Sequence, residues 1–205
     1  MTNWNTEAFE LLDKKPKQQN WGARRASKDK KYITSSESVE DYIVLDFETT
    51  GLRAGADKII QIGAIKYVNH EVKDMFNTFI NPSRHIPITV TSLTGISNEM
   101  VEWAPSIEEK IEELLEFIGD LPIIAHNASF DMGFLYALDA IEGVEIPTYT
   151  VIDTVKLARK KITQTPNHKL TTLTDFLQLE HDAHDAIGDC LATAAIYQYC
   201  TQMHV

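Results

Sequence analysis

The sequence has few of the residues that form cross-links or zinc sites. Its 205 residues include two cysteines, Cys190 and Cys200. Both fall in one predicted helix, where their separation along the chain places them about 15 Å apart, too far for a disulfide bond. No cluster of Cys and His has the spacing of a zinc site. We therefore expect two reduced thiols packed in the interior and no structural zinc.

The sequence also lacks a long apolar segment. A membrane-spanning helix needs roughly 20 consecutive apolar residues, and no such run occurs although 43% of the residues are hydrophobic. The chain does not open with a basic stretch followed by an apolar one, so no signal peptide is predicted. Its length suits one sizeable core. We expect a cytoplasmic protein that makes no membrane contact.

Basic residues are scarce outside the first part of the chain, and the net charge is -11. Residues 1–39 contain eight Lys and Arg against five Asp and Glu, whereas residues 40–205 contain 11 basic and 25 acidic residues. We predict a flexible basic arm over 1–39, either a solvated tail or a contact for nucleic acid or a partner, and one folded domain over 40–205. Because the domain is this acidic, bound cations would have to neutralise part of the charge if it binds a polyanion.

Hydrophobic periodicity predicts an α/β fold. Three β-rich runs, 42–47, 58–68 and 71–81, include a tight turn at Asn69-His70 and predict an antiparallel start. Strands then alternate with helices, which is typical of a mixed sheet with helices packed on its faces. The other predicted strands are 121–126 and 148–154, and the predicted helices are 107–119, 129–141, 154–162, 170–179 and 185–199.

Two carboxylates stand together where the first of these strands ends, in the stretch VLDFETTG. Asp46 and Glu48 are two residues apart, so both side chains point to the same face of a strand. Like charges this close repel unless one is protonated or a cation lies between them, and Mg²⁺ and Mn²⁺ favour carboxylate oxygens. Taken alone, the pair is equally consistent with a strand that ends in a polar loop.

Asp131 and Asp189 favour the metal interpretation. Each falls near the start of a predicted helix, and in alternating α/β folds helix starts and strand ends gather along one edge of the sheet. Singly, each acid could stabilise the N-terminus of its helix. Four carboxylates from separate elements that meet at one edge predict a metal site.

Two histidines occur in the same short pattern, H-x-A-x-x-D. It is HNASFD from His126 to Asp131 and HDAIGD from His184 to Asp189. A histidine near a strand end is usually a hydrogen-bonding residue of the core or its rim, the interpretation we favour for His126. His184 lies on a predicted loop, where an accessible imidazole with an ordinary pKa of about 6.5 suits proton transfer.

In this order, DFETTG, HNASFD and HDAIGD resemble the three motifs of the DEDDh 3′-5′ exonucleases, a family that includes the proofreading epsilon subunit of bacterial DNA polymerase III. The similarity covers roughly residues 41–199, where SLTGISNEMV and IDTVKLAR look like linking segments of the family. It implies an RNase H-like fold, with a mixed central sheet that starts with three antiparallel strands, continues with parallel strands and is flanked by helices.

The resemblance also implies two-metal hydrolysis of the terminal phosphodiester, with Mg²⁺ or Mn²⁺ as two ions per site and nucleoside 5′-monophosphates as products. By position in the motifs, Asp46, Glu48 and Asp189 match metal ligands, and Asp46 is expected to bridge both ions. Asp131 matches the remaining carboxylate, which often acts through water. His184 matches the general base. These five residues are the expected catalytic residues.

The expected substrate contacts lie in the first two motifs. Thr49, Thr50 and Gly51 resemble the family stretch whose backbone lines the terminal nucleotide, although Gly51 is at least as well explained as a turn glycine. His126 and Asn127 are also expected to lie against the substrate.

The densest group of basic residues outside the predicted arm either contacts the upstream backbone of a nucleic acid or is a solvated helix face. It consists of Lys156, Arg159, Lys160, Lys161 and Lys169.

Three functions remain open from the sequence. The leading prediction is a metal-dependent 3′-5′ exonuclease that acts on single-stranded or frayed DNA, as a partner of a DNA polymerase subunit or as a repair enzyme. The alternatives are an RNA-trimming exoribonuclease of the same family and a non-catalytic scaffold that binds nucleic acid. The scaffold is disfavoured because it would gain nothing from a carboxylate cluster that is costly to bury. The sequence does not decide between DNA and RNA, because that choice depends on the shape of the pocket.

Overall fold

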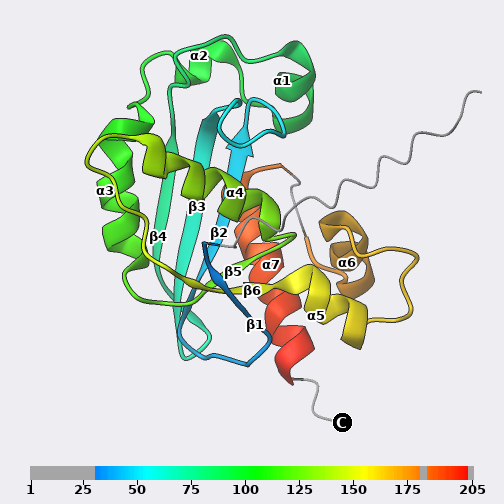
Figure 1. The fold of residues 1–205 in the computed structure, drawn as a ribbon. Helices are drawn as coiled ribbons and strands as arrows, with labels where there is room; N and C mark the ends of the chain where they lie inside the picture. The colour runs from blue at the N-terminus through cyan, green and yellow to red at the C-terminus, as the bar shows by residue number, and fades with distance from the viewer. Residues whose placement is uncertain (1–30, 181–183, 203–205) are drawn as a thin grey trace, which may run out of the picture. The chain divides into compact units, whose positions relative to one another are not determined.

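The computed structural model describes residues 31–180 and 184–202, whose arrangement is drawn in Figure 1. Most of the predicted N-terminal arm, residues 1–30, lies outside the described residues. Within the described residues, none of the helices combines the length and the apolar character that a membrane crossing requires.

A six-stranded sheet forms the centre of the fold, in the order β1-β6-β5-β2-β3-β4. Strands β2 (Tyr42–Thr49), β3 (Ile59–Val68) and β4 (Glu71–Phe79) are antiparallel neighbours, as predicted. Strands β5 (Ile123–Ala125) and β6 (Thr150–Asp153) run parallel to β2. The predicted mixed sheet is therefore confirmed.

Strand β1 (Ile33–Ser35) corrects the domain boundary that we predicted at residue 40. It pairs in parallel with β6, from Ile33 opposite Thr150 to Ser35 opposite Ile152. The described end of the predicted arm is thus part of the sheet. A strand of three residues is too short to produce a recognisable alternation of apolar and polar side chains, which is why the sequence pattern did not indicate it.

Helices cover both faces of the sheet. One face is packed by α3 (Ile107–Ile118) and α4 (Ser129–Ala137), and Figure 1 shows α4 crossing in front of the strands. The opposite face is packed by α5 (Thr154–Lys161), α6 (Leu170–Leu177) and α7 (Ala186–Gln202). Two short helices that the sequence pattern did not predict, α1 (Ile88–Thr94) and α2 (Asn98–Val101), precede α3.

The alternation of side chains along β2 divides the core into two layers. Leu45 and Phe47 pack in the cluster that includes α3 and α4, whereas Tyr42 and Val44 pack in the cluster that includes α7. Because side chains alternate with a period of two, the residues that continue the α7 side after Val44 are Asp46 and Glu48. The central strand therefore presents its two acids toward the last helix.

Helix α7 contains Cys190 and Cys200, which are free and buried, as expected. Burial raises the pKa of the Cys190 thiol well above its usual value. Its Sγ atom lies 3.3 Å from the carbonyl oxygen of Gly63 in β3. These cysteines serve as small apolar residues in the contact between helix and sheet.

Candidate active site

The end of β2 supplies two carboxylates to one place. Glu48 is buried, with 9% of its surface exposed, and Asp46 is half-buried beside it on the same side of the strand. Both belong to the central strand, where Asp46 pairs with Gly63 and Glu48 with Gln61 of β3. This pairing fixes the spacing of the two acids.

Asp131 reaches the same strand from the other face of the sheet. It is buried in the first turn of α4, and its Oδ1 atom accepts a hydrogen bond of 3.2 Å from the backbone N–H of Phe47. Strand β5 pairs with β2 only at Ile43 and Val44 and ends at Ala125. Phe47 therefore lies beyond the end of that neighbour, and the carboxylate takes the place of a strand partner.

Asp189 and His184 complete the group from the start of α7. One ligand atom each of Glu48, His184 and Asp189 lies within 4.8 Å of the other two. Asp189 is buried in the first turn of the helix. His184 is half-buried in the preceding turn, with a backbone φ of 69°, a conformation that costs a non-glycine residue free energy.

Two residues of β3 hold the start of α7 close to the acids. A Cβ atom on Gly63, which pairs with Asp46, would lie 2.6 Å from the backbone of Ala186, so only glycine permits this approach. Gln61, which pairs with Glu48, donates from Nε2 to Oδ1 of Asp185 at 3.2 Å. The other carboxylate oxygen of Asp185 accepts from Gly188 N–H at 3.0 Å and caps the helix.

The carboxyl groups of the site raise one another's pKa. Burial is the main cause for Asp46, whose pKa lies well above its ordinary value, and the charges of Asp131, Asp189 and Glu48 add to it. Burial is also the main cause for Glu48, and together with the charges of Asp189, Asp131 and Asp185 it raises the pKa of Glu48 to about 8. Burial also raises the pKa of Asp131 to about 8, against the hydrogen bond from Phe47, which lowers it.

A divalent cation fits this arrangement. Several carboxylates that are buried together are costly unless positive charge compensates them. The donor set of carboxylate oxygens and one imidazole suits a hard or borderline ion such as Mg²⁺ or Mn²⁺. The site therefore has both the electrostatic need and the ligand chemistry for metal binding.

Two cavities meet at Asp46 and Asp189, which line both. The first, of about 510 Å³, is lined also by Glu48, His184 and the 49–52 segment, and we call it the terminal cavity. The second, of about 490 Å³, is lined also by His126, Asn127, Arg159 and the 167–170 segment, and we call it the basic cavity. The acids thus stand between two hollows of different character.

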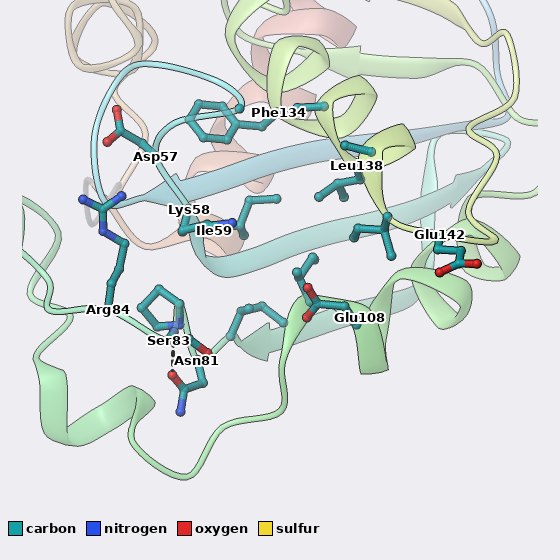
Figure 2. Close-up of a pocket in the computed structure, with 17 residues that line it drawn as sticks. Asp57, Lys58, Ile59, Asn81, Ser83, Arg84, Glu108, Phe134, Leu138 and Glu142 are labelled. Carbon is teal, nitrogen blue, oxygen red and sulfur yellow. Dashed lines mark hydrogen bonds between the residues drawn. The ribbon is translucent and has the colours of Figure 1, made fainter.

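A larger cavity of about 790 Å³ contains none of the predicted site residues. Figure 2 shows Arg84, Glu108 and Glu142 around an apolar surface that includes Ile59 and Phe134. Among the described residues that line it, no group was found that could hold a metal ion as Glu48, His184 and Asp189 could. Size alone is therefore a poor guide to the reactive site in this fold.

The predicted residues of the 49–51 turn all line the terminal cavity. The Thr49 hydroxyl donates to the Gly51 carbonyl at 2.6 Å, and the Thr50 hydroxyl accepts from Lys58 N–H at 3.0 Å. A Cβ atom on Gly51 would lie 2.6 Å from Oδ2 of Asp57. The turn is held by its own contacts, so the glycine is explained by packing within the turn.

His126 and Asn127 lie on the side of the basic cavity. Nδ1 of His126 lies 2.8 Å from the Thr154 hydroxyl, and Nε2 lies 3.0 Å from the His168 carbonyl oxygen. Burial lowers the pKa of this imidazole. Both ring nitrogens are engaged by the protein, which favours the rim interpretation, while Asn127 is exposed with a left-handed φ of 61°.

Sequence reasoning did not identify three contributors to the site. Gln61 and Gly63 looked like ordinary strand residues, and their role depends on a helix distant in sequence. Residues of α1, including Val90 and Leu93, form a wall of the terminal cavity. The only signal for α1 was that part of it falls in SLTGISNEMV, a linking segment of the family that the sequence resembles.

The sequence of the chain is similar to that of known exonucleases. A family model described as exonuclease, RNase_T, matches residues 43–197. The chain belongs to the exonuclease family. It is 43% identical over 157 residues to the DNA polymerase III PolC-type of Bacillus subtilis, an alignment that covers 76% of this chain and 11% of that protein.

A second family relative agrees with the first. The DNA polymerase III PolC-type of Caldanaerobacter subterraneus is 41% identical over 160 residues, which is 77% of this chain and 11% of that protein. The chain therefore spans about a tenth of the length of the curated relatives it matches.

Solved structures of the family share the fold. Exonuclease X in complex with 5′ overhanging duplex DNA is 26% identical, with a TM-score of 0.65 over 78% of this chain and 91% of that one. The nuclease domain of 3′hExo, a DEDDh family member bound to rAMP, is 17% identical, with a TM-score of 0.66 over 82% and 94% of the two chains. The predicted RNase H-like fold and the predicted membership of an exonuclease family are thus confirmed.

Proposed function

We propose that this domain is a 3′-5′ exonuclease that removes nucleoside 5′-monophosphates from single-stranded or frayed DNA ends. The observation that carries the proposal is the meeting of Glu48, His184 and Asp189 ligand atoms within 4.8 Å, beside the carboxylates of Asp46 and Asp131. Such a group combines metal ligands with a candidate base at the junction of two cavities.

The acids would hold two divalent ions, Mg²⁺ or Mn²⁺. Asp46, Glu48 and Asp189 are the proposed direct ligands, with Asp46 shared, and Asp131 is proposed to act through water. When bound, such ions lower the pKa of the attacking water and neutralise charge on the leaving oxygen. Asp131 also keeps β2 in place through its hydrogen bond with Phe47.

His184 is the proposed general base. It lines the terminal cavity, is half-buried and lies next to Glu48 and Asp189. A neutral imidazole in this position can accept the proton of the attacking water, which assists attack on the phosphorus. The attack breaks the bond to the 3′ oxygen of the preceding nucleotide and leaves the 5′-phosphate on the released one.

The substrate contacts and the biological role are proposals of the same kind. Thr49, Thr50 and Gly51 would contact the terminal nucleotide, with Asn127 and the ring edge of His126 against the nucleotide before it. DNA is favoured because the relatives are named DNA polymerases and Exonuclease X was solved with DNA. A polymerase subunit is therefore the proposed partner, in proofreading or repair, and the expected cytoplasmic location stays a prediction.

The decisive experiment is digestion of matched DNA and RNA oligonucleotides with Mg²⁺ or Mn²⁺, one set labelled at the 3′ end and one at the 5′ end. We expect a labelled mononucleotide from the first set at once and a descending ladder from the second. His184→Ala should abolish turnover, whereas His126→Ala, the matched variant in the twin pattern, should retain it.

The outcomes separate the candidate functions. Faster digestion of RNA than DNA would assign the domain to RNA trimming. If the protein neither digests an oligonucleotide nor binds a divalent ion, the non-catalytic scaffold is the function that remains. Loss of turnover in His126→Ala, with His184→Ala active, would exchange the roles of the two histidines.

A further inference from the structure

The two cavities that meet at the acids differ in charge. Within the described residues, the lining of the terminal cavity includes no Lys or Arg, and α1 contributes Val90 and Leu93 to it. The basic cavity is lined by Arg159 and Lys169, both exposed. In a domain that is acidic as a whole, these cations lie directly beside the reactive group.

A third hollow continues from the basic cavity. It has a volume of about 420 Å³, shares Arg159 with the basic cavity and is lined also by Lys156, Lys160, Ser35 and Ser36. Lys156 Nζ lies 3.8 Å from Oδ2 of Asp153. The basic cavity and this hollow form one stretch of surface, which we call the basic path, between the acids and the β1 edge of the sheet.

We infer that the basic path binds the upstream part of the single strand, with successive phosphates against Lys169, Arg159 and Lys160 and the serine hydroxyls of the 35–36 segment. This inference rests on the proposed function, which places the cleaved phosphodiester at the acids. A nucleic acid whose 3′ end lies in the terminal cavity has to continue on the other side of Asp46 and Asp189. That side carries the cations that a phosphate backbone requires.

The protein holds part of the path in shape. Nε2 of His126 lies 3.0 Å from the His168 carbonyl oxygen, and Nε2 of His168 lies 2.9 Å from the Ile162 carbonyl oxygen. Oδ1 of Asn167 accepts from Lys169 N–H at 3.0 Å. The loop that carries Lys169 is therefore tied to the end of α5, which carries Arg159. His126 is a positioning residue for this loop.

A purely structural role for these cations makes a different prediction. Arg159 and Lys160 stand in the last turn of α5, where positive charge stabilises a helix through its dipole. If that were their whole role, their removal would lower the midpoint of thermal unfolding. It would leave the dependence of activity on substrate length unchanged.

The test compares two substrates of the full chain with Mn²⁺. The p-nitrophenyl ester of thymidine 5′-monophosphate has no upstream nucleotide, whereas a DNA octanucleotide extends along the path. In the double variant Arg159→Ala/Lys169→Ala, we expect the KM for the octanucleotide to rise about tenfold and its salt slope to fall by about 0.7 for each lost phosphate contact. Kinetics on the ester should be unchanged.

Lys73→Ala is the matched control, because Lys73 is an exposed lysine on β4, the opposite edge of the sheet. It removes one positive charge from a site remote from the basic path and should leave the kinetics on both substrates unaffected. Arg159→Lys should restore most of the octanucleotide affinity. The inference would be overturned if the double variant lost activity equally on the ester and the octanucleotide, or if its KM for the octanucleotide were unchanged.

Equilibrium binding keeps the two proposals apart. If the wild-type chain cleaves neither substrate, the proposed function fails, and anisotropy of a labelled octanucleotide in the presence of Ca²⁺ still tests the path. Weaker binding of the double variant, with Lys73→Ala like wild type, supports the path. Equal binding by all three proteins rejects it.

Discussion

Oδ1 of Asp131 accepts a hydrogen bond from the backbone N–H of Phe47, at an N···O distance of 3.2 Å. The contact joins α4 to the part of β2 that lies between Asp46 and Glu48. One side chain thus both fixes the strand that carries two acids and adds its own charge to theirs.

Substitution of Asp131 should separate these two tasks. Asp131→Ala leaves the Phe47 N–H buried without an acceptor, and we expect a loss of about 1–3 kcal/mol in the free energy of unfolding. Asp131→Asn keeps an acceptor and removes charge, so its stability in chelator should be at least that of wild type, while nuclease activity falls by about a hundredfold or more. Urea unfolding and oligonucleotide digestion measure the two effects. Equal stability of the two variants would contradict this division.

Glu48 should make the stability of the metal-free protein depend on pH. Its pKa is raised from 4.5 to about 8 in the folded state, so the folded protein holds more protons than the unfolded chain between these values. The free energy of unfolding therefore falls as pH rises from about 4.5 to 8. Because metal ligands must be deprotonated, the stabilisation by added Mn²⁺ should be larger at the upper end.

Thermal unfolding in chelator across this range measures the slope. Glu48→Gln should flatten it, whereas Glu112→Gln, at an exposed position on α3, should leave it as in wild type. A slope that Glu48→Gln does not change would show that other groups set the pH dependence.

Gly63→Ala should move the last helix. The added Cβ would lie 2.6 Å from backbone atoms of Ala186, which cannot give way as a flexible side chain does. Overpacking of this kind costs about 1–3 kcal/mol, and the displaced helix should also weaken Mn²⁺ binding, because Asp189 moves with it. Calorimetric titration with Mn²⁺ and thermal unfolding check both effects. Gly143→Ala is the control for backbone strain alone. An added Cβ atom at Gly143 meets nothing within 4 Å, whereas its backbone φ is +83°.

Gln61→Leu should loosen the start of α7 without touching a metal ligand. The variant loses the hydrogen bond to Asp185 and leaves Ala186 N–H without its acceptor, Oε1 of Gln61, at 3.5 Å. We expect Mn²⁺ affinity to fall by about tenfold, as is typical of residues that orient ligands. Asn77→Ala removes another partner of the Gln61 amide, at 3.1 Å, and should have a smaller effect. Unchanged affinity in Gln61→Leu would rule out a positioning role for this glutamine.

The sequence predicted the elements that have a clear period or a recognisable motif. The alternation in β2 and β3 gave the central strands, and the spacing of Asp46 and Glu48 gave their common face. The twin H-x-A-x-x-D patterns could not be distinguished by spacing, because the difference is tertiary: His126 hydrogen-bonds to Thr154 and His168, whereas His184 faces Glu48 and Asp189. Short β1 and the close approach at Gly63 depend on partners distant in sequence.

Helix α7 brings Asp189 close to Glu48 of the central strand, and this has a consequence for the order in which the proposed metal site forms. Asp46 and Glu48 are synthesised early and Asp189 much later, and chains emerge from the ribosome N-terminus first. If these acids are the metal ligands, as we propose, a nascent or partly unfolded chain lacks a complete set of them. The proposed metal site then forms only when α7 has packed against the sheet.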